Sequence, residues 1–322
     1  MTVHASLSAG DRLEQSDAGR QFDDLKALCA GMPPLPTAVI HPCDETSLRS
    51  ATDGAREGLI EPVLVGPRAA IESVAGQLGI DISALRIVDA GTTRAAAAKG
   101  IELAANGEVG AVMKGALHTD ELMGAVLKRE GGLRTSKRVS HVFVMRVATY
   151  PKPLLITDGV VNITPTLEDK AHIAQNAIDL ACALGIEQPR VAVLSAVETV
   201  NPKIASTIDA AALCKMADRG QIRGGIIDGP LAFDNAISAE AARTKGIASQ
   251  VAGQPDILLV PDLASGNMLV KQLSFLANGE VAGIILGTSM PVILTSRADS
   301  LQSRLSSCAL AVLLANRAGA NA

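Results

Sequence analysis

The densest group of polar residues in the sequence runs from Lys114 to Glu121, with the letters KGALHTDE. Gly115 allows the backbone to approach a ligand closely, and a helix that begins near His118 and Thr119 would offer unpaired N–H groups to an anion. A basic cluster in an otherwise acidic chain favours an anionic ligand such as a phosphate or a nucleotide tail, although a solvated basic face with an ordinary helix cap would give the same pattern. The residues of this basic cluster are Lys128, Arg129, Arg134, Lys137 and Arg138.

Two later segments place polar side chains next to predicted strands. Asp228 follows a predicted strand over 225–227, and Asp234 lies a little further along. Ligands of α/β proteins bind beyond the carboxyl ends of strands, so these carboxylates could hold or polarise a substrate; a turn with a helix cap explains them equally well. The other segment leads from a strand into a helix and resembles an anion cradle, a pattern also common without any ligand. Its residues are Ser265, Gly266 and Asn267.

The last predicted helix begins with a fourth polar group, which contains Thr295, Ser296, Arg297 and Asp299. An arginine beside two hydroxyls can clamp an oxyanion. Asp299 could equally be a negative charge that the helix dipole favours at an N-terminus. Cys308 follows in an apolar helix and is predicted to be a core residue rather than a nucleophile.

Several motifs of nucleotide- and cofactor-dependent enzymes are missing from the sequence. It contains no P-loop, no G-x-G-x-x-G after a strand and no G-x-S-x-G elbow. The five histidines are scattered without the spacing of metal ligands. We therefore expect no metal and no bound cofactor.

Composition narrows the class of partner and the location. The net charge of −4 and the aromatic content of 2% disfavour binding to nucleic acid, which needs basic surface and stacking platforms. The five cysteines are odd in number and lack CxxC spacing, which is typical of reduced thiols. The N-terminus is polar, and no apolar stretch reaches the roughly 20 residues of a spanning helix. The sequence predicts a cytoplasmic protein with no nucleic-acid or membrane partner.

Short apolar runs alternate with longer amphipathic segments, which is the pattern of an α/β fold. Strands are predicted over 37–41, 62–65, 86–88, 111–113, 141–145, 154–157, 190–195, 225–227, 257–260, 282–286 and 292–294. Helices are predicted over 48–59, 92–105, 119–128, 167–184, 208–217, 267–276 and 300–316. Most strands are apolar throughout, so we expect mainly parallel sheets with helices on both faces. A chain of 322 residues should form two lobes with a ligand cleft between them.

Seven segments, taken together and in order, resemble the phosphate acetyl/butyryltransferase family. They are 114–123, 133–145, 156–162, 195–203, 228–236, 261–271 and 294–300, and the resemblance extends from about residue 30 to the end. It implies a two-lobed fold like that of isocitrate and isopropylmalate dehydrogenases. After a disordered or loosely ordered tail over 1–20, the first lobe would comprise 21–150 together with 288–322. The second, inserted lobe would comprise 151–287. The family resemblance also implies a homodimer.

The reaction implied by the resemblance is acyl-CoA + phosphate ⇌ acyl phosphate + CoA, by direct transfer in a ternary complex. Ser296 and Arg297 match the family's catalytic Ser-Arg pair. Arg297 would stabilise phosphate charge, and Ser296 would bond the developing oxyanion or thiolate. Acetyl-type relatives place an aspartate, the presumed thiol base, where Ser303 stands here. Asp299 is the nearest carboxylate and is our candidate base, about one helical turn away.

Other residues are expected to bind the substrates acyl-CoA, phosphate and acyl phosphate. Some relatives carry an arginine where Gly124 stands, so Lys128, Arg129 or Arg134 would supply that charge instead. Two alternatives stay open: a metal-requiring, NAD-dependent dehydrogenase of the same fold, and a non-catalytic protein that binds acyl-CoA or acyl phosphate. The sequence leaves acetyl and butyryl groups undistinguished, because one methylene changes discrimination by only about 1–3 kcal/mol. The expected substrate-binding residues are Lys114, His118, Thr119, Arg134, Asp228, Asp234, Ser265, Gly266 and Asn267.

Overall fold

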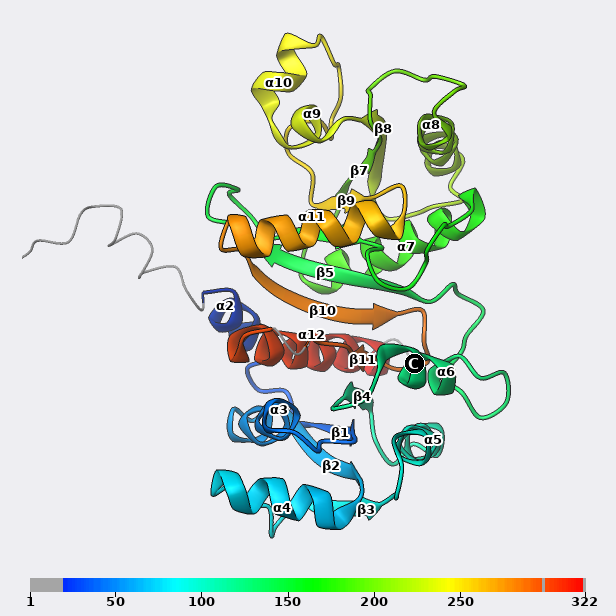
Figure 1. Cartoon of the computed structure of the whole chain (residues 1–322). Helices are drawn as coiled ribbons and strands as arrows, with labels where there is room; N and C mark the ends of the chain where they lie inside the picture. Colours follow the sequence, from blue (N-terminus) through cyan, green and yellow to red (C-terminus); the bar gives the residue numbers. More distant parts are fainter. Residues whose placement is uncertain (1–19, 297–298, 321–322) are drawn as a thin grey trace, which may run out of the picture.

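The structure is a computed structural model that describes residues 20–296 and 299–320. The tail predicted over 1–20 lies outside these ranges except for its last residue. Figure 1 shows an elongated molecule in which the strands form one sheet along the long axis, with helices on both sides. No helix in the described ranges is long and apolar enough to cross a membrane.

The described part of the chain contains eleven strands, and they join in a single sheet. The strands match the eleven predicted ones, and the largest difference is at β8, which continues to Leu231. In order across the sheet they are β3 (Arg86–Asp89), β2 (Ile60–Gly66), β1 (Leu35–Ile40), β4 (Ala111–Lys114), β11 (Val292–Ile293), β10 (Glu280–Leu286), β5 (Ser140–Arg146), β6 (Leu154–Thr157), β9 (Ile257–Leu259), β7 (Arg190–Leu194) and β8 (Ile226–Leu231).

All seven predicted helices are present. They are α3 (Glu45–Arg56), α5 (Thr93–Ala105), α6 (Thr119–Val126), α7 (Leu167–Ala183), α8 (Ala205–Asp218), α11 (Leu263–Leu276) and α12 (Leu301–Ala320). Four further helices within the described residues were not predicted from the sequence: α2 (Arg20–Leu28), α4 (Arg68–Leu78), α9 (Phe233–Ile237) and α10 (Ala239–Thr244). α4 buries only Ile71 and Ala75 among its eleven residues, so its apolar periodicity is weak.

The sheet is parallel in its outer parts and antiparallel at its centre. β10 pairs antiparallel with β11 and β5, and β5 pairs antiparallel with β6. The other strand pairings in the described residues are parallel. The predicted α/β fold with mainly parallel strands is therefore confirmed. β10 belongs to the segment assigned to the second lobe, yet it lies between β11 and β5 of the first, and the division into lobes stays a prediction.

The two faces of the sheet are covered differently. On β5, Val142 and Val144 contribute to the core on one face, while Phe143 and Met145 contribute to the other. The first face carries one continuous core beneath α2, α3, α4, α7, α8 and α12. The second face carries two separate cores among the described residues, one beneath α5 and α6 and one beneath α11. Together, β5 and β10 contribute to both of these cores, with Phe143, Met145 and Val281 in the core beneath α11 and Ile285 in the other.

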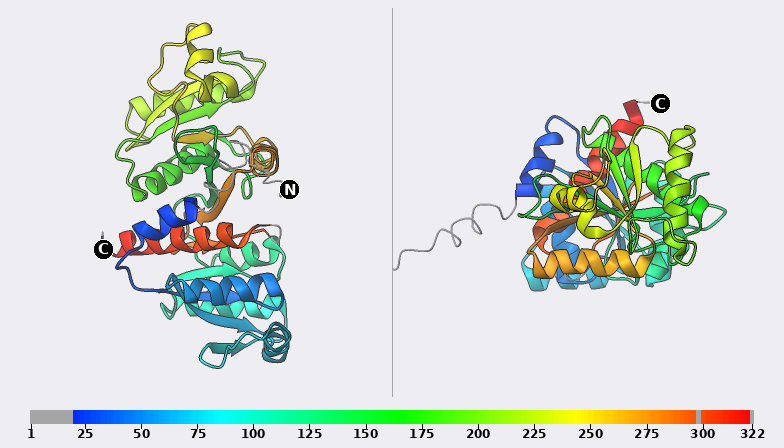
Figure 2. Two further views of the ribbon diagram at one scale, coloured as in Figure 1. Left: turned by 90° about the vertical axis from the view of Figure 1, so that its left-hand side faces the viewer. Right: turned by 90° about the horizontal axis from the view of Figure 1, so that it is seen from above.

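The last helix closes the first face of the sheet. Figure 2 shows α12 beside α2, at opposite ends of the sequence, and α12 also packs on α3. The Sγ of Cys29, which directly follows α2, donates to the carbonyl oxygen of Ala309 in α12 at 3.5 Å. Cys308 is completely buried in this helix, and burial raises its pKa to about 12. The prediction that Cys308 is a core residue is confirmed.

Candidate active site

A cavity of about 570 Å³ opens between α6 and α11, over the centre of the sheet. Its floor contains Phe143 of β5 together with Val281 and Gly283 of β10. Several of its lining residues are far apart in the sequence, so the fold rather than local chain geometry brings them together. Five residues expected from the sequence line it: Lys114, Thr119, Asn267, Ser296 and Asp299.

Ser296 and Asp299 form a tight turn directly before α12; Arg297, between them, lies outside the described residues. The Ser296 N–H donates to Asp299 Oδ2 at 2.7 Å, and the Asp299 N–H donates to the Ser296 carbonyl oxygen at 3.2 Å. Burial raises the pKa of Asp299 above its usual value, although the Ser296 hydrogen bond and the charges of Arg304 and Lys114 oppose the shift. A raised carboxyl pKa suits a group that exchanges protons near neutral pH.

Ser303 stands where the family resemblance leads us to expect an aspartate, and its hydroxyl is paired with a second one. Ser303 lines the same cavity, and its Oγ lies 3.0 Å from Ser300 Oγ. The next residue, Arg304, is almost completely buried and donates from Nη1 to the Asp299 carbonyl oxygen. Arg304 was not expected from the sequence, although an arginine inside an otherwise apolar helix was the available signal. Its positive charge lies beside the turn that carries Ser296 and Asp299.

Lys114 and Thr119 stand at the two ends of the turn from β4 to α6. Only glycine fits at position 115, because the Cβ of any other residue would lie 2.3 Å from a carbonyl oxygen of β1 and clash with it. α6 begins at Thr119 as predicted, and Glu121 Oε2 accepts from the His118 N–H at 3.1 Å. The positive end of the α6 dipole therefore lies at the cavity wall, where it favours an anion. His118 is exposed and does not line the cavity.

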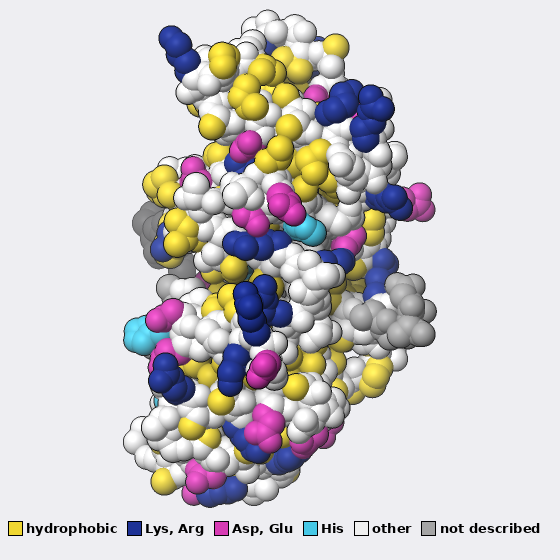
Figure 3. All heavy atoms as spheres, turned by 90° about the vertical axis from the view of Figure 1, so that its right-hand side faces the viewer, with side chains coloured by type: hydrophobic (Ala, Val, Ile, Leu, Met, Phe, Trp, Pro, Cys, Tyr) yellow, Lys and Arg dark blue, Asp and Glu magenta, His cyan; other side chains and the backbone are white. Residues whose placement is uncertain are grey.

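The basic cluster that follows α6 lies at the surface. Figure 3 shows Lys and Arg side chains near the middle of the face that carries α6. Two members of the cluster bind acidic side chains: Lys137 lies 2.9 Å from Asp179, and Arg138 lies 3.3 Å from Asp169. Arg134 is exposed, pairs with the β10–β11 turn in an isolated bridge and does not line the cavity. A contact of this cluster with substrate stays a prediction.

The cradle expected at Ser265, Gly266 and Asn267 is divided between two sides of α11. Asn267 lines the cavity, and its Nδ2 donates to the Gly159 carbonyl oxygen at 3.2 Å. Ser265 lines a different hollow of about 790 Å³, and its N–H donates to the capping residue Asp262 at 2.8 Å. A Cβ at Gly266 would lie 3.0 Å from Gly159 Cα, so this glycine allows α11 to pack closely. Only Asn267 of the three reaches the cavity.

Asp228 and Asp234 do not line the cavity. Because β8 continues to Leu231, Asp228 lies within a strand rather than at its carboxyl end as predicted. Its Oδ1 accepts from the Gly229 N–H at 2.8 Å. Asp234 lies in α9 and forms an ion pair with Lys245 at 3.1 Å. Both carboxylates therefore have local partners, and their binding to substrate stays a prediction.

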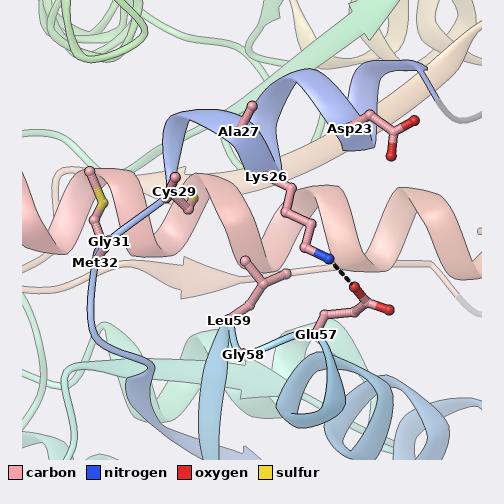
Figure 4. Close-up of a pocket in the computed structure, with 10 residues that line it drawn as sticks. Asp23, Lys26, Ala27, Cys29, Gly31, Met32, Glu57, Gly58 and Leu59 are labelled. Carbon is pink, nitrogen blue, oxygen red and sulfur yellow. Dashed lines mark hydrogen bonds and ion pairs between the residues drawn. The ribbon is translucent and has the colours of Figure 1, made fainter.

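A further hollow of about 500 Å³ lies between α2 and the turn after α3 (Figure 4). Lys26 and Glu57 form an ion pair there. Cys29 also lines it, and burial raises the pKa of its thiol to about 11. None of the residues expected to be catalytic or substrate-binding lines this hollow. The cavity between α6 and α11 is therefore the better candidate site.

Comparison with known proteins identifies the class of enzyme. A family model described as "Phosphate acetyl/butaryl transferase" matches residues 91–312. The chain is 56% identical over 297 residues to a phosphate acetyltransferase of Rhizobium meliloti, which covers 92% of this chain and 94% of that protein. It is 44% identical over 272 residues to a phosphate butyryltransferase of Clostridium acetobutylicum, which covers 84% and 90%. The chain belongs to the phosphate acetyl/butyryltransferase family, and it is an acyltransferase.

Solved structures agree on the fold. A branched-chain phosphotransacylase from Enterococcus faecalis matches with a TM-score of 0.77 at 29% identity, covering 87% of this chain and 99% of that one. The 4-hydroxythreonine-4-phosphate dehydrogenase of Klebsiella pneumoniae matches with a TM-score of 0.55 at 14% identity, covering 89% and 99%. The latter is a likeness of fold alone. It confirms the predicted dehydrogenase-like architecture, while family membership disfavours dehydrogenase activity.

Proposed function

We propose that the chain transfers a short acyl group directly between CoA and inorganic phosphate in the cavity between α6 and α11. Family membership gives the reaction class, acyl-CoA + phosphate ⇌ acyl phosphate + CoA. One observation carries the assignment of the site. A hydroxyl, a carboxyl of raised pKa and a lysine line one cavity, from Ser296, Asp299 and Lys114. These are the groups needed to stabilise an oxyanion, exchange a proton and hold a phosphate.

In the direction of acyl phosphate synthesis, a phosphate oxygen attacks the carbonyl carbon of the thioester. A C–O bond forms as an oxyanion develops, and the C–S bond then breaks to release CoA thiolate. The Ser296 hydroxyl donates to the oxyanion, and Lys114 with the start of α6 holds the phosphate. Arg297 offsets phosphate charge; this role follows from the family resemblance alone. Each of these groups acts without forming a bond to the acyl carbon.

Asp299 exchanges the proton of the CoA thiol. A thiol has a pKa of about 8.5, so the leaving thiolate gains a proton near neutral pH and the thiol loses one in the reverse direction. Burial raises the Asp299 pKa toward that of the thiol, which makes the transfer easier. Ser303 cannot act as a base at this pH, because a hydroxyl loses its proton only at much higher pH. Asp299 is therefore the base in this chain.

Release of CoA thiol from acetyl-CoA, with and without phosphate, tests the proposed site. Ser296→Ala removes the oxyanion donor and should lower kcat by about 10²-fold or more. Ser206→Ala is the matched control, because Ser206 lines the 790 Å³ hollow rather than the active-site cavity, and it should keep the wild-type kcat. Equal rates for Ser296→Ala and the wild type would remove Ser296 from the reacting centre.

Initial-velocity patterns test direct transfer. Varying acetyl-CoA at several fixed phosphate concentrations should give double-reciprocal lines that intersect, because both substrates are bound before reaction. Parallel lines are the pattern of a covalent acyl-enzyme and would contradict direct transfer. The same data set gives kcat and KM for both substrates.

Acetyl is proposed as the preferred acyl group. The acetyltransferase relative is 56% identical to this chain, whereas the butyryltransferase relative is 44% identical. The expected result is a higher kcat/KM for acetyl-CoA than for butyryl-CoA under the same conditions. A preference for butyryl-CoA would reverse this part of the proposal.

A homodimer, with two lobes in each subunit, completes the proposed assembly. α11 exposes Met268, Phe275 and Leu276, whose side chains are 59%, 71% and 84% accessible. Residues seven or eight positions apart share one face of a helix, so these side chains form a single apolar surface. Leu276→Glu should shift the mass measured by light scattering toward the monomer. Leu28→Glu, at another exposed leucine, should leave it unchanged; a monomeric wild type would refute the dimer.

A cytoplasmic location is also proposed. All five cysteines lie in the described residues and are free. Unpaired thiols are typical of a reducing compartment, where acyl-CoA is also made and used. Fractionation of cells that produce the tagged chain tests the location, and recovery outside the cytoplasmic fraction would contradict it.

A further inference from the structure

The floor of the active-site cavity is built around a glycine. Gly283 of β10 is the register partner of Phe143 on β5, and both residues line the cavity. A Cβ at Gly283 would lie 2.9 Å from His141 Nε2, so a side chain here would collide with the imidazole. The missing side chain leaves room for the His141 ring, which occupies that place in the centre of the sheet.

The His141 ring packs against the Phe143 ring. The two residues are separated by one position on β5 and therefore point to the same face of the sheet. Their ring centroids lie 4.3 Å apart at an interplanar angle of 57°. His141 is completely buried, whereas Phe143 is only partly buried and reaches the cavity. The Phe143 side chain at the cavity floor is therefore held in place by its packing against His141.

The cavity lining contains both apolar and charged side chains. The apolar ones come from both cores of this face, Phe143 and Val281 from one, and Val160 and Leu294 from the other. The Leu294 carbonyl oxygen would lie 3.1 Å from a Cβ at Gly283, so Leu294 lies beside the register partner of Phe143. Leu294 is two residues before Ser296, a separation of at most about 7 Å along the chain. The charged side chains Lys114 and Asp299 also line the cavity. An acyl group whose carbonyl lies at Ser296 would place its hydrocarbon chain against the apolar side chains of this lining.

We infer that Phe143 sets the upper limit on the length of the acyl chain. This inference rests on the proposed function and adds a specificity-determining residue to it. A longer acyl chain extends further from Ser296 over the cavity floor, where it meets the Phe143 ring that His141 holds in place. The Phe143 side chain therefore discriminates between acyl groups by excluding the longer ones from the cavity floor.

The test is the ratio of kcat/KM for butyryl-CoA to kcat/KM for acetyl-CoA, measured on the same preparation of each variant. A ratio is independent of the fraction of active protein, so partial unfolding of a variant does not distort it. Phe143→Ala should raise the ratio by about tenfold or more, because hydrophobic pockets discriminate about tenfold or more per methylene. Phe143→Leu removes less volume and should raise it by a smaller factor.

Phe233→Ala is the matched control, since Phe233 is a 37% exposed phenylalanine of α9 that lines the 790 Å³ hollow rather than the active-site cavity. It should keep the wild-type ratio. The inference is overturned if Phe143→Ala and Phe143→Leu keep the wild-type ratio, or if Phe233→Ala raises it equally. If Phe143→Ala does not fold, Phe143→Leu alone decides. A wild type inactive with every C2–C5 acyl-CoA would instead refute the proposed function, so the two failures are distinguishable.

Discussion

Lowering the pH should destabilise the protein through His141 at the centre of the sheet. Among the described residues, neither ring nitrogen of this buried side chain makes a hydrogen bond of good geometry. Burial lowers the His141 pKa from 6.5 to about 4, although the charge of Asp158 and the carbonyl of Leu294 oppose the shift. The native protein therefore keeps a neutral imidazole at pH values where the unfolded chain binds a proton.

The size of the effect follows from proton linkage. Between pH 6.5 and pH 4 the unfolded chain binds one proton more than the native protein at this site, so the free energy of unfolding falls as the pH falls. Each pH unit in that window costs about 1.4 kcal/mol, which gives a total loss of about 3 kcal/mol. This loss of unfolding free energy is absent well above pH 6.5 and almost complete at pH 4. A loss of this size is a large part of a typical stability of about 5–15 kcal/mol.

Urea unfolding at pH values from 7 to 4 measures the effect when wild type and His141→Phe are compared. The substitution keeps a ring against Phe143 but removes the titratable nitrogens. Over this window the wild type should lose about 3 kcal/mol more than the variant, because the contributions of carboxylates that do not interact with His141 cancel in the difference. His172→Phe, at a partly exposed histidine of α7, should lose as much as the wild type. Equal losses for the wild type and His141→Phe would refute the reasoning.

Three further predictions concern packing, catalysis and reactivity. Gly266→Ala should lower the free energy of unfolding by about 1–3 kcal/mol, because the new Cβ would lie 3.0 Å from Gly159 Cα. Gly124→Ala is the control and should not lower it, because its Cβ would meet nothing within 4 Å. Equal urea midpoints for the two variants would contradict this prediction. In the direction that consumes CoA and acyl phosphate, where Asp299 accepts the thiol proton, Asp299→Asn should lower kcat by about 10²-fold or more. It should also remove the acidic limb of the pH–rate profile, which in the wild type lies above the usual aspartate pKa of 3.8. An unchanged profile would exclude Asp299 as the base. Cys308 should not react with iodoacetamide at neutral pH in the native protein, because its thiol is buried, and it should react after unfolding. Mass spectrometry of the peptides measures the modification. Modification of Cys308 in the native protein would contradict the burial of this side chain.

The strands could be predicted from sequence because their signals are local. β6, for example, has the same bounds as its prediction over 154–157, since an apolar run ends at a proline on one side and an aspartate on the other. The order of the strands could not be predicted in this way. The pairing of Phe143 with Gly283 joins segments that are distant in the chain, and no local pattern specifies it.

The site could be predicted only in part, because a motif does not show which way its side chains point. Lys114, Asn267 and Ser296 were proposed from separate motifs, and the structure gathers them in one cavity. Ser265 has the same sequence context as Asn267, yet it lies on the other side of α11. Arg304 was missed because its contact with the Asp299 carbonyl depends on the turn before α12 rather than on a recognisable motif.

The most direct test of acyl transfer to phosphate is the molar ratio of acyl phosphate formed to CoA released by the purified chain. Acyl phosphate is trapped as a hydroxamate and CoA is measured by its thiol, in a reaction that contains acetyl-CoA and phosphate. The expected result is equal amounts of the two products, and no CoA release when phosphate is left out. Release of CoA without phosphate, or the absence of acyl phosphate with every C2–C5 acyl-CoA, would contradict direct transfer of an acyl group to phosphate at this site.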